Sequence, residues 1–172
     1  MKNEYIREFL CWAIPCFTHP KIYSRERKEY IRTVWPKIKR KVLNGKINEK
    51  ILKFWYSAYP FFKRNVERGM KNPMKEYMFK EHNEFVAMEF KRRKKISKCL
   101  AMVGVVISGK NYLIVDVLGK RKRVKNSCNA KRGDYVGIHI GEAVEIIDRK
   151  EYVRYLKLLK KYSNIIFYPN RT

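Results

Sequence analysis

Residues 132–143 read Arg-Gly-Asp-Tyr-Val-Gly-Ile-His-Ile-Gly-Glu-Ala, and this stretch indicates how the C-terminal half folds. Its first three residues are a turn signal, and the apolar run Tyr135–Ile140 that follows has the composition of a β-strand. Three further runs of this kind precede it: Leu100–Ile107, Tyr112–Leu118 and Lys120–Val124. Short strands joined by polar turns predict a compact β-barrel.

The pattern changes to a helix after the strands. From Asp148 the apolar residues recur at helical spacing, and Asp148 itself is a favourable N-cap. The residues on the apolar face are Tyr152, Tyr155, Leu156, Leu159 and Tyr162. We therefore expect a terminal amphipathic helix.

The first half of the chain is helical in its periodicity. Apolar residues recur every three or four positions, as in Tyr30, Val34, Ile38 and Val42. We expect helices from Ser24 to about Leu43, from about Asn48 to Ala58, and over Phe61–Met70. The sequence thus predicts an α+β protein with a basic helical domain at residues 1–95 and a small OB-like β-barrel with a C-terminal helix at residues 96–172.

Four stretches in the second half, taken in order, resemble the HypC/HupF family of hydrogenase-maturation chaperones. Cys99-Leu100-Ala101-Met102-Val103-Gly104 resembles the cysteine-led opening of that family, with Val103 in place of the usual proline. The segments Val115–Val124 and 132–143 resemble its middle strands, and Glu145–Asp148 followed by a helix completes the set. The helical first half has no counterpart in ordinary members of the family.

The resemblance implies a non-enzymatic scaffold that works with a HypD-like protein or the hydrogenase large subunit. It implies that Cys99 and His139 bind iron, which the protein would hold only transiently as cargo. Thiolate and imidazole are suitable ligands for such iron, and a working thiolate requires Cys99 to be at least partly exposed. Here Cys99 is internal rather than at the chain terminus, so a structural role as a small buried residue is the alternative.

The net charge of +25 has two interpretations, a general bias of the composition toward lysine or a polyanionic or acidic partner. Residues 1–95 hold 25 Lys and Arg against 10 Asp and Glu, and residues 96–172 hold 16 against 6, so both halves are basic. Five consecutive cations, Lys91, Arg92, Arg93, Lys94 and Lys95, are a candidate contact site for phosphate or acidic protein. An RNA- or DNA-binding module is therefore the alternative to the accessory-protein interpretation.

Other features of the sequence argue against several classes of protein. No apolar run approaches the ~18 residues of a transmembrane helix, and four cysteines without a secretion signal indicate a reducing cytoplasm. No nucleotide-binding loop or catalytic motif is present, so we expect no enzymatic activity. Cys11, Cys16 and His19 form a weak candidate metal cluster, and His82 is expected on an exposed helix surface.

Overall fold

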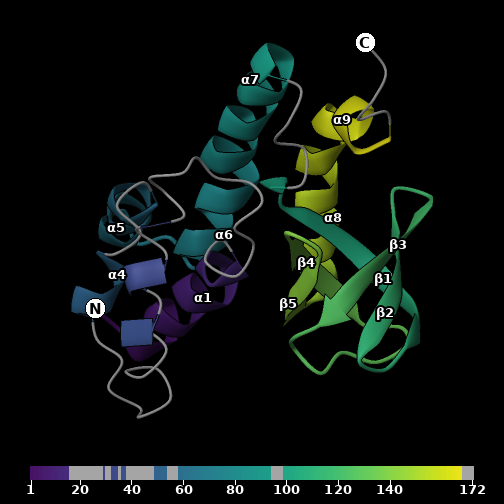
Figure 1. Cartoon of the computed structure of the whole chain (residues 1–172), viewed down its shortest axis with the longest axis horizontal. Helices are drawn as coiled ribbons and strands as arrows, with labels where there is room; N and C mark the ends of the chain where they lie inside the picture. The colour runs from purple at the N-terminus through teal and green to yellow at the C-terminus, as the bar shows by residue number, and fades with distance from the viewer. Residues whose placement is uncertain are drawn as a thin grey trace. The chain divides into compact units, whose positions relative to one another are not determined.

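The computed structural model of the chain describes residues 1–15, 29, 32–34, 36–37, 49–53, 58–93 and 99–167. It divides into two compact units, Met1–Tyr77 and Met78–Thr172, which contain the elements labelled in Figure 1. Helices in the first half, a barrel and a C-terminal helix confirm the predicted α+β class. The domain boundary predicted between residues 95 and 96 lies outside the described residues and stays a prediction.

The first unit is built from helices. An edge-to-face contact between Phe9 and Phe62, with ring centroids 4.8 Å apart, forms part of its core, and Glu8 accepts a hydrogen bond of 3.1 Å from the backbone N–H of Lys75. Its helices are α1 (Asn3–Ala13), α4 (Glu49–Leu52), α5 (Tyr59–Glu67) and α6 (Pro73–Tyr77). These helices confirm the helical periodicity of the first half.

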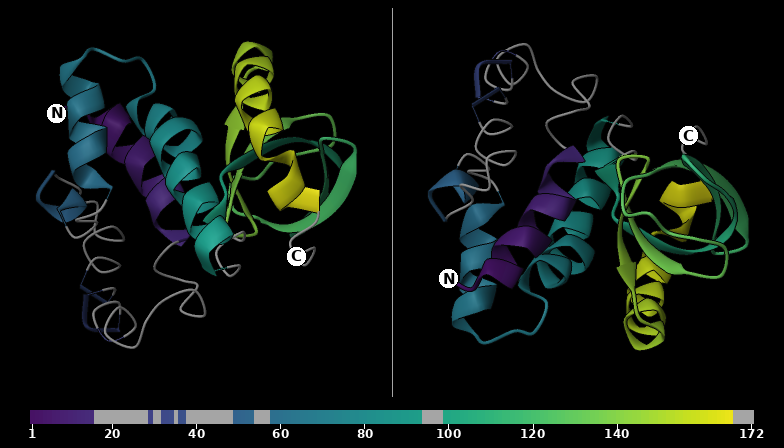
Figure 2. Two further views of the ribbon diagram at one scale, coloured as in Figure 1. Left: turned by 90° about the horizontal axis from the view of Figure 1, so that it is seen from above. Right: turned by 90° about the horizontal axis from the view of Figure 1, so that it is seen from below.

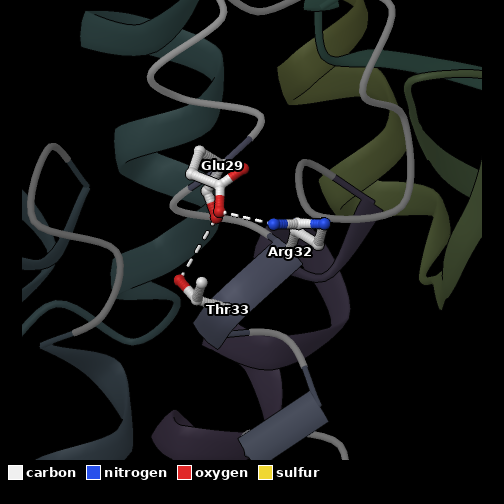
Figure 3. Close-up of polar contacts among 3 residues, drawn as sticks. All are labelled: Glu29, Arg32 and Thr33. Atoms are coloured by element: carbon white, nitrogen blue, oxygen red, sulfur yellow. Dashed lines mark hydrogen bonds and ion pairs between the residues drawn. The ribbon is translucent and has the colours of Figure 1, made fainter.

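The helix expected from Ser24 to Leu43 lies largely outside the described residues, but one short part of it is seen. Figure 3 shows Arg32 donating a hydrogen bond of 2.8 Å to the Glu29 carboxylate, and the Thr33 hydroxyl donating one of 3.2 Å to the Glu29 carbonyl. These contacts join residues three and four positions apart, which is the spacing of neighbours on a helix.

The second unit contains a closed five-stranded barrel. Its strands are β1 (Met102–Gly109), β2 (Tyr112–Val117), β3 (Lys120–Asn126), β4 (Tyr135–His139) and β5 (Glu142–Ile147). They are ordered β1-β2-β3-β5-β4, and the pairing of β1 with β4 closes the ring that is visible in Figure 2. All pairs are antiparallel except β3 with β5. The predicted barrel is confirmed.

Alternation along the strands separates the barrel interior from its outer surface. Leu113, Val115 and Val117 of β2 are fully buried, as expected for residues two apart on one face of a strand. Gly104 of β1 lies against them, because a Cβ placed there would be 2.4 Å from Val115 Cγ1 and 2.5 Å from the Asp116 carbonyl oxygen. Glycine at this position therefore permits the close approach of β1 and β2.

The C-terminal helix α8 (Arg149–Leu159) begins where the sequence predicts. Asp148 accepts a hydrogen bond of 2.7 Å from the backbone N–H of Glu151, and the Glu151 carboxylate accepts one of 3.2 Å from the backbone N–H of Asp148. This reciprocal capping box fixes the start of α8. The helix packs on β1 and β4, and a 3-10 turn (Lys160–Tyr162) and α9 (Ser163–Phe167) follow it.

A helical segment that precedes the barrel in the sequence also belongs to the second unit. It consists of the π-helical turn η2 (Met78–His82) and α7 (Asn83–Arg93). Phe79 of η2 stacks on Tyr155 of α8, with ring centroids 4.4 Å apart. The segment therefore packs on the same helix as the barrel does.

Asn83 attaches this segment to the chain that leads into β1. Its side-chain amide donates a hydrogen bond of 2.9 Å to the Ala101 carbonyl and accepts one of 2.8 Å from the Ala101 N–H. Both residues are fully buried. Asn83 thus provides the pairing that a neighbouring strand would otherwise give to Ala101.

We expect Asn83→Ala to destabilise the protein strongly. The substitution leaves two buried backbone groups of Ala101 without these bonds, and each such group costs about 1–3 kcal/mol. Urea unfolding followed by circular dichroism measures the loss. The control is Asn164→Ala at an exposed position of α9, which should change stability by less than about 0.5 kcal/mol. Equal effects of the two substitutions would contradict this role of Asn83.

Candidate functional site

Cys99 and His139 are both buried. The exposed fraction of Cys99 is 6%, and that of His139, the last residue of β4, is zero. The expectation that Cys99 is partly exposed is therefore wrong for this structure. The burial of Cys99 has a physical reason. Asn83 holds Ala101, two residues after Cys99, inside the protein by two hydrogen bonds. The chain that carries the cysteine is thereby drawn into the core.

The strand register brings the two segments to the same end of the barrel. Met102 of β1 pairs with Ile138 of β4, so the residues before Met102 run beside the residues after Ile138. Cys99 precedes β1 closely, and His139 follows Ile138 directly. The structure thus places both segments at one end of the β1–β4 pair, whereas their joint use as iron ligands stays a prediction.

A second histidine contacts His139. The imidazole of His82, at the end of η2, lies edge to face with that of His139 at a centroid separation of 5.3 Å and an interplanar angle of 87°. The expectation of an exposed helix histidine at position 82 is therefore wrong. Spacing alone could not reveal this contact, because it joins residues of a helix and a strand that are far apart in the sequence.

His82 and Asn83 are consecutive residues that approach the site in different ways. His82 contacts the histidine at the end of β4, and Asn83 holds the backbone before β1. The π-helical turn ends between them, and such turns are frequent at functional sites because they shift the direction of side chains. One short helical segment therefore fixes both strand ends at which the predicted residues lie.

His82 is half-buried, and the loss of solvent around its imidazole determines its charge. Loss of solvent lowers the pKa of His82 to about 4, and a side-chain hydrogen bond with Asn83 acts in the opposite direction. His82 is consequently neutral at physiological pH. The contact with His139 thus involves an uncharged imidazole of His82.

The described residues do not supply a complete metal-binding set. No group of three or more His, Cys, Asp or Glu side chains is arranged to hold a metal within the part of the chain that the structure describes. Cys99 and His139 could at most contribute some of the ligands. Of the weaker candidate cluster, Cys11 is exposed on α1, and Cys16 and His19 lie outside the described residues.

The run of five cations begins in the last turn of α7. Lys91 is exposed near the end of α7, and Arg92 and Arg93 are the last residues of that helix. Lys94 and Lys95 lie outside the described residues, so the use of this run as a contact site stays a prediction.

None of the helices found among the described residues has the length and apolar composition that a membrane span requires.

The lowered pKa of the half-buried His82 predicts a particular pH dependence of stability. Its pKa of about 4 in the folded protein lies below the value of 6.5 for an ordinary histidine. The unfolded chain therefore takes up the proton first, so this contribution to stability is complete above pH 6.5 and is lost as the pH falls toward 4. Urea unfolding at several pH values measures this effect. As the pH falls, the free energy of unfolding should decline less for His82→Gln than for the unsubstituted protein. Parallel declines would contradict the lowered pKa of His82 in the folded protein.

Comparison with known proteins gives a family for the C-terminal part. The profile of the HupF/HypC family matches residues 99–159, which begin at Cys99 and include all five strands and α8. A comparison with curated proteins finds no match. The predicted resemblance of the barrel to the HypC/HupF family is thereby confirmed for residues 99–159, which follow a helical N-terminal region.

Proposed function

We propose that this protein is a non-enzymatic accessory factor of [NiFe]-hydrogenase maturation that docks onto a partner of the maturation machinery. The observation that carries the proposal is the family match, which spans the residues of the barrel and of α8. A HupF/HypC-family domain supports a chaperone-like role in maturation. The partner would be a HypD-like protein or the hydrogenase large subunit.

The iron-handling part of the proposal concerns Cys99 and His139. A cysteine thiolate is a soft ligand for iron, and an imidazole can ligate or orient the same centre. Iron would be cargo for these residues rather than a resident cofactor. Since the described chain offers no complete ligand set, the remaining ligands would come from the partner or from the cargo itself.

Burial of both residues requires a change of conformation before iron can be received. The chain before β1 must leave the core so that Cys99 becomes accessible, and this breaks the two hydrogen bonds between Asn83 and Ala101. A partner can drive such a change only if it binds the opened form more tightly than the closed form. We propose that docking of the partner supplies this difference.

The charge supports an acidic surface on the partner. The chain carries a net charge of +25, and the five cations Lys91–Lys95 directly precede the segment of Cys99. Attraction between surfaces of opposite charge speeds association and orients the two proteins. We propose that these cations guide the partner toward the segment that must open.

The test is co-purification of the tagged full chain with a HypD-like protein expressed in the same cells. We expect a nuclease-resistant complex that contains iron. Cys99→Ser should leave the complex intact and remove the iron, because the thiolate is lost while the docking surface is unchanged. The control Cys128→Ser, at a half-buried position in the turn after β3, should retain both.

Two results would count against this function. Failure to form a complex with either a HypD-like protein or a hydrogenase large subunit would contradict the docking role. A complex that retains its iron in Cys99→Ser would preserve docking but remove the proposed role of the thiolate. Light scattering measures the complex, and elemental analysis measures the iron.

A further inference from the structure

The outer surface of β3 carries a row of cations. Arg121, Arg123 and Lys125 are exposed, while Val124 between the last two is buried in the barrel. Residues two apart on a strand share one face and lie about 6.6 Å apart along it. Residues 110–125 as a whole hold six Lys and Arg against one Asp. The β2–β3 hairpin therefore presents a regular cationic surface.

An aromatic side chain is part of this surface. Tyr112 of β2 is 53% exposed, and the Arg123 guanidinium lies over its ring at 4.3 Å from the centroid. Tyr112 pairs in register with Lys125, and Ile114 with Arg123, so the cation reaches the ring diagonally across the two strands. Arg123 and Tyr112 therefore form a cation–π pair in which the guanidinium lies over one face of the ring.

The carboxylates near this surface neutralise only part of it. Asp116 pairs in register with Arg121 and accepts a hydrogen bond of 2.9 Å from the backbone N–H of Gly119. Glu142 lies 3.7 Å from the Lys125 ammonium and also accepts a hydrogen bond from Ser127. Arg123 is instead directed at the tyrosine ring. The surface therefore keeps an excess of positive charge next to an exposed aromatic ring.

We infer that the outer face of the β2–β3 hairpin, formed by Tyr112, Arg121, Arg123 and Lys125, binds single-stranded nucleic acid. Phosphates would follow the cations along β3, and a base would stack on the Tyr112–Arg123 pair. A single strand fits better than a duplex because its bases are free to stack on protein side chains. An acidic protein would use the cations but has no comparable use for the exposed aromatic ring, so it is the less suitable occupant.

The first experiment tests stacking. The full chain is titrated into a fluorescein-labelled 12-nucleotide oligouridine RNA, and the dissociation constant is measured by fluorescence anisotropy. We expect Tyr112→Ala to weaken binding about tenfold, and Tyr112→Phe to stay within about twofold because it keeps the ring. The matched control is Phe85→Ala on α7, where the aromatic ring is 59% exposed but has no part in the proposed surface.

The second experiment tests the phosphate contacts. The double variant Arg121→Gln, Arg123→Gln should reduce the slope of log affinity against log salt concentration by about 1.4, since each contact with a single strand contributes about 0.7. The control removes two charges from exposed residues elsewhere in the second unit, with Lys157→Gln and Lys160→Gln. Its slope should change much less. Thermal unfolding checks that each variant remains folded.

Several outcomes would overturn the inference. Unchanged affinity in Tyr112→Ala would exclude stacking. Equal effects of the two charge variants would show that binding depends on the overall charge and not on the cations of β3. Tighter binding of polyglutamate than of oligouridine, measured by competition, would instead indicate an acidic protein as the partner of this surface. Tighter binding of a duplex of equal length would exclude the single-strand preference.

Discussion

The bonding of both Ala101 backbone groups to one buried asparagine side chain is the constraint on which the closed site depends. A chain that enters a barrel must satisfy its backbone N–H and C=O groups before strand pairing begins. Here Asn83 does this from a helix, at 2.9 and 2.8 Å. The residues around Ala101 are thereby fixed in the core, and Cys99 is buried with them. His82 directly precedes Asn83 in the sequence and contacts His139. The helical segment before the barrel is thus part of the site.

This arrangement keeps the two proposed functional regions of the second unit apart. The end of the β1–β4 pair contains Cys99 and His139 in a buried, closed state, and its proposed chemistry requires an opening step. The outer face of β2 and β3 is exposed, cationic and aromatic, and needs no such step to bind. The buried region depends on the helical segment of η2 and α7, whereas the exposed one depends only on strand register. Each region can therefore be tested by substitutions that leave the other unchanged.

Local signals in the sequence predicted much of the fold. The strands β1 to β4 and the Asp148 cap follow from alternation, turn residues and capping preferences, which act over a few positions. Strand β5 was missed because its turn, at Ile140 and Gly141 with positive φ angles of 49° and 75°, lies inside an apolar run. The contacts of His82 and Asn83 could not be predicted, since they join a helix to strand ends that only the folded chain brings together. The burial of Cys99 depends on one of these contacts, and the sequence indicated it only as an alternative.

We expect Cys99 to be inaccessible to solvent in the isolated protein, and thiol alkylation measures this accessibility. The protein is treated with N-ethylmaleimide under native conditions and in urea, and modification of each cysteine is followed by peptide mass spectrometry. Cys128 is half-buried and serves as the internal reference. Native Cys99 should react about a hundredfold more slowly than Cys99 of the unfolded chain, because opening of a packed segment costs a few kcal/mol. Modification of native Cys99 as fast as that of Cys128 would contradict it.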